Sequence, residues 1–337
     1  MTADAGTIDE RTRSAYWQAV SVGDDYAARR VAEEALAAGA HPGSLLDLVV
    51  QGQVCVGGLW ARNEWTVARE HAATAAGEAV VRLLATHVPE PVGGPLVVVA
   101  CVEREWHAMP ALVVAQRLRL AGLRVDHLGA SVSRDQLVSH IVDHGPRAAL
   151  LSASLSSSLP RVRRHVEAVR GTGTPVVLGG RAFDAAGVRA RRLGATAHAA
   201  DPARIPDLLA SLPRHVTAAP PLRHPSAVEA RSVISVADDV ARDVVATLRG
   251  GWGTAPGSLD DTPDDWRAVL TTFVPHVVDS LVGALLTEDP SVLEETRGWL
   301  EDVLAQRGSP AHTVAGLWAA LHARLRDHPE ALALLGR

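Results

Sequence analysis

The sequence contains no lysine, so all 33 of its basic residues are arginine. Without a side-chain amine, the chain has no phosphate-loop lysine and forms no Schiff base with pyridoxal phosphate or retinal. Its only two cysteines, Cys55 and Cys101, lie far apart and cannot form a disulfide framework. No apolar run reaches the length of a membrane span, and residues 1–13 are polar, without a signal-peptide core. We therefore expect a soluble, cytoplasmic protein that does not bind a membrane.

Positive charge is also scarce, because the 33 arginines are outnumbered by 38 acidic residues and the net charge is −5. This balance lacks the basic patch that nucleic-acid binding requires. A length of 337 residues allows two or three domains, and 47% hydrophobic residues suit a folded globular protein. We expect a multidomain protein that does not bind DNA.

Hydrophobic periodicity and proline-rich linkers divide the chain into three domains, at residues 8–90, 95–212 and 225–337. The first domain has the pattern of a four-helix bundle, with helices expected at 8–22, 26–38, 45–60 and 66–86. The third is predicted to be all helical, with helices at 227–249, 263–286, 291–306 and 311–327, and a short one ending at 335. Thr262-Pro263 and Ser309-Pro310 are expected to begin two of these helices.

The middle domain alternates strands and helices, which predicts a doubly wound, parallel, Rossmann-like sheet. The expected strands are 96–102, 124–128, 148–153, 175–178 and 197–199. The expected helices are 110–121, 133–144, 159–171 and 183–193. Ligands of such sheets bind beyond the carboxyl ends of the strands, so the loops at these ends are the first place to look for a site.

Three of these loops carry suitable residues. After the first strand, Glu105 and His107 flank Trp106, and an imidazole there can ligate a metal while its other nitrogen donates to a carboxylate. After the third strand comes a run of small hydroxyl residues, 152–158, and after the fourth comes Gly179-Gly180. Hydroxyls and bare backbone allow a large polar ligand to approach closely. No GxGxxG pattern is present in these loops, which disfavours a dinucleotide.

The helical bundle contributes a second group, in which Trp60 ends one helix and Glu70-His71 lies in the first turns of the next. A turn between these helices brings the three residues to one edge of the bundle. On spacing alone, the simpler interpretation is a core tryptophan followed by a solvated helix start.

Together these residues resemble the cobalamin-binding module of corrinoid photoreceptors and methyl-transfer corrinoid proteins. That module has a four-helix cap over a Rossmann-like domain, and its signature is an acid, one residue, His, two residues, Gly, then Ser-x-Leu and Gly-Gly. Here Glu105-Trp106-His107 matches and Pro110 replaces the glycine. The resemblance implies that His107 is the lower axial ligand of cobalt. Gly179-Gly180 matches fully, whereas Ser152-Ala153-Ser154 matches the serine and departs at the leucine, with Leu155 adjacent. The resemblance also implies that Ser152, Gly179 and Gly180 accommodate the cofactor's buried nucleotide tail, and Ser154 and Leu155 are further candidates for cofactor binding.

The cap is similar to that of the light-sensing branch, which has a tryptophan, nine residues and then Glu-His. By this resemblance, Trp60 packs on the adenosyl group of adenosylcobalamin and Glu70 contacts it. His71 then ligates cobalt from above once light has cleaved the Co–C bond. Light-sensing repressors of this kind begin with a DNA-binding helix-turn-helix, whereas this sequence begins with the bundle. We therefore expect the output to pass to another protein or through an oligomer interface.

A cobalamin domain followed by a globin-like or phycobiliprotein-like all-α domain resembles the photocobilins, which pair B12 with a bilin. The resemblance implies a second chromophore, biliverdin or another bilin, bound without a covalent bond because no cysteine follows Cys101. Its expected contacts are Trp266, His276 and His312, and Pro275 should kink the helix beside His276. A plain helical dimerisation domain is the alternative for this region.

Three functions follow from the sequence. The first is a light sensor without catalytic activity, which holds adenosylcobalamin and a bilin. The second is a corrinoid carrier that passes a methyl group between partner enzymes; it would need His107 but no lid shaped for adenosine. The third is a regulatory module that binds cobalamin as a ligand and engages a partner through the C-terminal domain.

Overall fold

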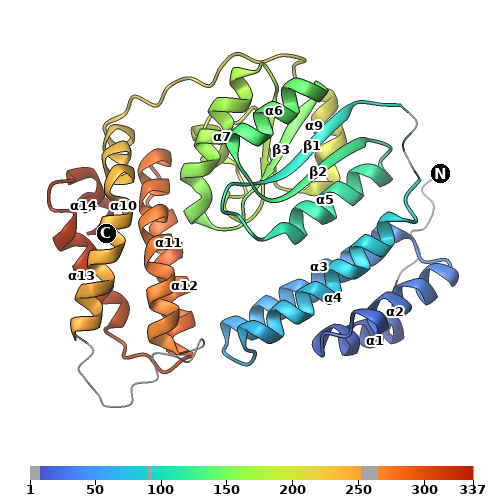
Figure 1. Cartoon of the computed structure of the whole chain (residues 1–337), viewed down its shortest axis with the longest axis horizontal. Helices are drawn as coiled ribbons and strands as arrows, with labels where there is room; N and C mark the ends of the chain where they lie inside the picture. Colours follow the sequence, from blue (N-terminus) through green and yellow to red (C-terminus); the bar gives the residue numbers. More distant parts are fainter. Residues whose placement is uncertain (1–7, 90, 92, 252–264, 337) are drawn as a thin grey trace.

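The computed structural model describes residues 8–89, 91, 93–251 and 265–336. Figure 1 shows three parts: a helical cap, an α/β domain above it, and a set of C-terminal helices that stands beside both. The cap contains α1 (Glu10–Ser21), α2 (Asp25–Ala37), α3 (Pro42–Ala61) and α4 (Val67–Ala85). These helices match the four that the sequence predicts, within three residues at each end.

Local sequence explains where the cap helices begin. Asp9, Asp24 and Thr66 each accept a hydrogen bond from a backbone N–H of the first turn, and Pro42 opens α3, where its missing N–H costs nothing. The helices then bury a shared apolar core around Tyr16.

The middle domain is a five-stranded parallel sheet in the order β2-β1-β3-β4-β5. Its strands are β1 (Leu96–Val102), β2 (Arg124–Val132), β3 (Ala148–Ser152), β4 (Val176–Gly179) and β5 (Ala197–Ala199). Its α-helices are α5 (Ala108–Leu120), α6 (Arg134–His144), α7 (Leu159–Gly171), α8 (Val188–Arg192) and α9 (Ile205–Ser211). The strand order reverses between β1 and β3, which is the position where sheets of this kind bind ligands. The doubly wound, parallel sheet that the sequence predicts is therefore confirmed.

Three details of the middle domain differ from the sequence prediction. β2 continues to Val132, four residues beyond the strand predicted at 124–128. The helix expected at 183–193 is only the short α8, because the Asp184 side chain accepts from the N–H groups of Val188 and Arg189 and delays the helix start. The α9 helix, which packs on the sheet through Ile205 and Leu209, was not predicted at all.

The C-terminal part is all helical, as predicted. It contains α10 (Pro225–Gly251), α11 (Trp266–Thr287), α12 (Ser291–Ala305), α13 (Thr313–Arg324) and α14 (Pro329–Leu335). The prediction that Ser309-Pro310 begins a helix is wrong, because α13 starts at Thr313. The other predicted start, Thr262-Pro263, lies outside the described residues. A globin-like arrangement of these helices stays a prediction.

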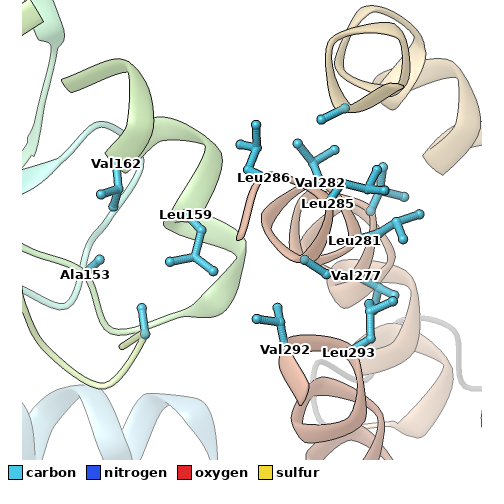
Figure 2. Close-up of a cluster of buried hydrophobic side chains, with 14 of the residues drawn as sticks. Ala153, Leu159, Val162, Val277, Leu281, Val282, Leu285, Leu286, Val292 and Leu293 are labelled. Carbon is cyan, nitrogen blue, oxygen red and sulfur yellow. The ribbon is translucent and has the colours of Figure 1, made fainter. Parts of the chain in front are cut away.

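The C-terminal helices share one continuous apolar core with the α/β domain. Figure 2 shows Leu159 of α7 on one side of this boundary and Leu286 of α11 on the other. Gly283 allows the close approach, because a Cβ there would lie 3.0 Å from the Leu159 side chain and 3.2 Å from the Ser156 carbonyl oxygen. The third domain is therefore packed directly against the loop that follows β3.

Two helices, α3 and α11, are long and apolar enough to cross a membrane by length and composition, which the sequence analysis did not expect. The buried share of the apolar segment is 67% in α11 and 33% in α3. A core helix of a soluble protein has the same composition, so this finding is weak evidence for a membrane protein.

Candidate functional site

The three predicted loops meet at one edge of the sheet. Cys101 pairs in register with Ser152, and Ser152 pairs with Gly179, so β1, β3 and β4 end side by side. After β1, Arg104 adopts a left-handed backbone conformation (φ 62°), and this turn brings Glu105 back toward the strand ends.

Glu105 is the centre of the site, and it is buried, with only 1% of its surface exposed. Its Oε1 accepts hydrogen bonds from the backbone N–H of His107 (3.1 Å) and lies 2.6 Å from His107 Nδ1. Its Oε2 accepts from the backbone N–H groups of Ser154 (2.7 Å) and Leu155 (3.3 Å) and from Ser158 Oγ (3.1 Å). Burial opposes ionisation of this carboxyl, but the hydrogen bonds from His107 and Ser154 and the His107 charge lower its pKa overall.

His107 combines a fixed ring with an accessible nitrogen. Its side chain is 54% exposed, while Nδ1 is held by the Glu105 carboxylate. The hydrogen bond to Glu105 raises the pKa of His107 against the effect of burial; the negative charges of Glu105 and Glu70 add to the increase, and Arg181 opposes it. With the proton kept on Nδ1, Nε2 presents its lone pair to a ligand, as in carboxylate–histidine–metal sites.

Pro110, which replaces the glycine of the signature, costs α5 no backbone hydrogen bond. It is the third residue of α5, in the first turn, where a backbone N–H has no partner within the helix. His107 immediately precedes this helix, and Trp106 beside it exposes 73% of its surface. The substitution therefore leaves the position of the histidine intact.

The hydroxyl-rich loop contacts two different parts of the molecule, and its sequence did not show which residue contacts which part. Ser154, Leu155 and Ser158 bind Glu105, as described above. Ser156 Oγ instead lies 3.0 Å from Ser280 Oγ, and Ser157 Oγ lies 3.0 Å from His276 Nδ1, both on α11. Ser158 was missed as a site residue, although it belongs to the hydroxyl run that the sequence analysis singled out.

Gly180 is required by the backbone of the third loop. Its φ is +111°, and a Cβ there would lie 2.3 Å from the carbonyl oxygen of Ala153. A Cβ on Gly179 would meet the Ala199 carbonyl oxygen at 3.4 Å, a much milder contact. The Gly-Gly pair therefore allows the loop after β4 to pack closely against the loop after β3.

On the cap, Glu70 and His71 are brought together and lie on the side of His107. His71 Nδ1 is 2.5 Å from Glu70 Oε2, and Glu70 is close enough for its charge to raise the pKa of His107. Thr74, one turn further along α4, donates to Glu70 Oε1 or to Gln53 Oε1, each at 3.0 Å. The sequence analysis missed Thr74 and Gln53; the i, i+4 spacing of Glu70 and Thr74 was the available signal for the first.

Trp60 contacts the third domain. Its ring stacks on Trp299 (centroids 6.2 Å apart), and the Arg307 guanidinium lies 4.8 Å from its centroid. Arg307 also donates to the last carbonyls of α3, at Trp60 (2.9 Å) and Ala61 (3.3 Å). Arg307, which belongs to the C-terminal domain, thus satisfies the last carbonyl groups of α3, the cap helix on which Trp60 lies.

The residues expected to bind a bilin do not converge. Trp266 and His276 are ten positions apart in α11, which is about 15 Å along the helix axis. Trp266 is buried under the Arg267 guanidinium, His276 bonds to Ser157, and His312 is exposed just before α13. Their role in bilin binding stays a prediction.

Comparison with known proteins agrees with this geometry. Two B12-binding-domain families match the chain, one over residues 12–85 and the other over residues 95–204. The chain therefore carries two regions that match B12-binding domains. The first match coincides with the cap, and the second with the sheet and the three loops of the site.

Solved structures show the same fold. The monomethylamine corrinoid protein of Methanosarcina barkeri is 18% identical, with a TM-score of 0.52, and the match covers 60% of this chain and 98% of that one. A cobalamin-binding protein from Desulfitobacterium hafniense DCB-2 is 22% identical over 58% of this chain and 98% of that one, but its TM-score of 0.33 is too low to support an argument. No curated protein matches the chain.

The residues present fit a corrinoid. His107 offers an imidazole nitrogen, a ligand that suits a first-row transition metal such as cobalt, and the buried Glu105 fixes its tautomer. Gly180 lets the loop after β4 lie directly against the loop after β3, because a Cβ there would lie 2.3 Å from the Ala153 carbonyl oxygen. Glu70 and His71 lie on the cap side of the same site. The residues that could hold a corrinoid therefore lie at the edge of the sheet that faces the cap.

Proposed function

We propose that this protein is a light sensor that holds adenosylcobalamin between the cap and the sheet and passes the signal on without catalysis. His107 holds the cofactor from below, and Ser152, Gly179 and Gly180 border its nucleotide tail. Adenosylcobalamin supplies, when bound, a cobalt–carbon bond that light can break. The observation that carries the proposal is His107 fixed by the buried Glu105, with Glu70 and His71 opposite it on the cap.

The cap is also connected to a domain that can report its position. Arg307 binds the last carbonyls of α3, and Trp60 of that helix stacks on Trp299 of α12. A cap movement that shifts the end of α3 must either break these contacts or move the C-terminal helices with it. We therefore propose that the C-terminal helices receive the signal and transmit it to a partner protein or to a second copy of the chain.

The proposal includes a bilin, biliverdin or a related one, bound without a covalent bond by the C-terminal helices. It is supported by the order of the domains and by the all-helical third domain. A thioether is excluded there, because both cysteines, Cys55 and Cys101, lie in the first two domains.

A corrinoid carrier for methyl transfer is the second candidate. The fold shared with the monomethylamine corrinoid protein over 98% of that chain favours it. The contact of Trp60 with Arg307 of the third domain favours the sensor, because it joins the cap to helices that lie outside the two matched B12-binding domains.

An absorption spectrum tests these alternatives. The apoprotein is incubated in the dark with adenosylcobalamin and biliverdin, freed of unbound ligand, and measured before and after green and red light. We expect a bound cobalamin spectrum that changes irreversibly in green light, and a far-red band from the bilin. Binding of cobalamin without a light-dependent change in structure or oligomeric state would favour the carrier, and the absence of a far-red band would remove the bilin.

The His107→Ala variant tests the lower ligand. It should bind cobalamin more weakly and with a shifted spectrum, whereas His322→Ala, which alters an exposed histidine of α13, should behave as the wild type. An unchanged spectrum in His107→Ala would remove His107 from the site.

A further inference from the structure

A second group of potential ligands lies on the edge strand β2 and on the helix that follows it. Asp126 belongs to the amino-terminal half of β2, while the cobalamin site lies at the carboxyl ends of the strands. His140 and His144 are one turn apart at the end of α6. One ligand atom from each residue can be chosen so that all three atoms lie within 4.8 Å of one another.

The side chains are already oriented by hydrogen bonds. His140 Nε2 lies 2.9 Å from Asp126 Oδ2, and the His144 ring stacks on the His140 ring with centroids 4.1 Å apart. His144 Nδ1 is 2.9 Å from the His140 carbonyl oxygen, so Nδ1 donates there and Nε2 keeps its lone pair. A histidine whose second nitrogen donates to a backbone carbonyl is the usual form of a metal ligand.

The surroundings allow an ion to enter. The three residues line a surface cavity of about 410 Å³, and the Asp126 and His140 side chains are 35% and 22% exposed. Arg119 also lines the cavity, but its guanidinium is held by Gln116 Oε1 (3.2 Å) and the Val125 carbonyl oxygen (2.8 Å). Among the described residues, only His140 forms a hydrogen bond with the Asp126 carboxylate.

Two physical arguments favour a cation at this point. His144 is the last residue of α6, and the carboxyl end of a helix carries the negative end of its dipole. Histidines at i and i+4 on one helix face, together with a carboxylate, form a donor set that suits zinc-like ions better than Mg²⁺ or Ca²⁺, which prefer oxygen ligands.

From this geometry we propose a divalent transition-metal site of the zinc class, with Asp126, His140 and His144 as protein ligands and solvent in the remaining position. In tetrahedral zinc sites the ligand atoms lie about 3.3 Å apart. His140 Nε2 and Asp126 Oδ2 are 2.9 Å apart, close to this spacing, and all three ligand atoms lie within 4.8 Å of one another, so a bound ion would draw the exposed His144 ring closer. A bound ion would join the edge strand to α6.

Calorimetric titration of the cobalamin-free protein with Zn²⁺ tests the site, with thermal unfolding as a second readout. We expect one equivalent at this site and a higher Tm with the metal. His144→Ala and Asp126→Asn should each lower the affinity at least about tenfold and abolish the Tm shift, because each removes one of three ligands. His322→Ala, which alters an exposed helical histidine elsewhere, should bind as the wild type does.

A His107→Ala variant separates this site from the cobalamin site, where Glu70, His71 and His107 could also collect zinc. Binding that is lost in His107→Ala but retained in His144→Ala would overturn the proposal, as would a wild-type protein that binds no Zn²⁺. Cobalamin binding by His144→Ala should be normal, so the two proposals succeed or fail separately.

Discussion

Replacing Glu105 by Gln should weaken cobalamin binding through the tautomer of His107. The carboxylate accepts five hydrogen bonds, two from His107 on Oε1 and three from the β3 loop on Oε2. An amide retains only one acceptor oxygen. If its NH₂ group points toward the loop, the backbone N–H groups of Ser154 and Leu155 both lose their partner.

If the NH₂ group points toward His107, only one backbone N–H is left unsatisfied, because the imidazole can change its tautomer and accept at Nδ1. This orientation costs less, since each buried unsatisfied donor costs about 1–3 kcal/mol. It moves the ring proton to Nε2, the nitrogen that cobalt requires. We therefore expect a 10–100-fold loss of cobalamin affinity, or about 1.4–2.8 kcal/mol, as for other groups that orient metal ligands.

The assay is a titration of the apoprotein with hydroxocobalamin, followed by absorbance and calorimetry, for the wild type, Glu105→Gln and Glu103→Gln. Glu103 is a matched control, because the same change is made two residues earlier, at a side chain that forms a distant, partly exposed ion pair with Arg164 (3.7 Å). Its variant should bind as the wild type. Wild-type affinity and spectrum in Glu105→Gln, with a folded protein by circular dichroism, would refute the reasoning.

Three further predictions concern the loops and the domain boundary. Gly180→Ala should lower the free energy of unfolding by at least about 1–3 kcal/mol and reduce cobalamin binding, while Gly171→Ala, with open space around it, should be neutral in thermal unfolding and titration. Gly283→Leu should separate α11 from α7 and increase the rate of limited proteolysis between the domains, whereas Gly298→Leu should leave that rate unchanged. Burial lowers the pKa of His276, so the unfolded chain takes up this proton first as the pH falls. Stability should therefore decrease below about pH 6.5, and His276→Asn should flatten that part of the Tm profile; an identical profile in the variant would contradict the assignment.

The sequence predicts the sheet and the meeting of three loops at its edge well, because both depend on local patterns. β1 is a continuous apolar run, which only a strand buried on both faces tolerates. The Gly-Gly pair is also a local signal, because the backbone conformation of Gly180 leaves no room for a Cβ. In contrast, the start of α8 depends on a capping bond from Asp184, and α9 on packing against the sheet, and neither leaves a strong periodic pattern.

The cap–domain contacts could not be predicted, because they join residues more than 200 positions apart. Trp60 was expected to cover the cofactor, and nothing in its neighbourhood predicts Arg307 or Trp299 as its partners. The bilin residues illustrate the same limit: Trp266 and His276 share one helix, but the helical rise places them on different turns, about 15 Å apart.

The loop after β3 explains why the third domain cannot be independent of the cobalamin site. Within five residues, Ser154 and Ser158 hold the carboxylate that orients His107, while Ser156 and Ser157 bond to α11. A displacement of α11 therefore pulls on the same short 3₁₀ turn, Ser156–Ser158, that supports Glu105. By reciprocity, any change at the cobalt ligand that moves this turn must alter the docking of the C-terminal helices. The site thus has two connections to the third domain, this loop from below and the end of α3 from above, and the proposed signal requires only that cofactor binding changes the relative strain of these two connections.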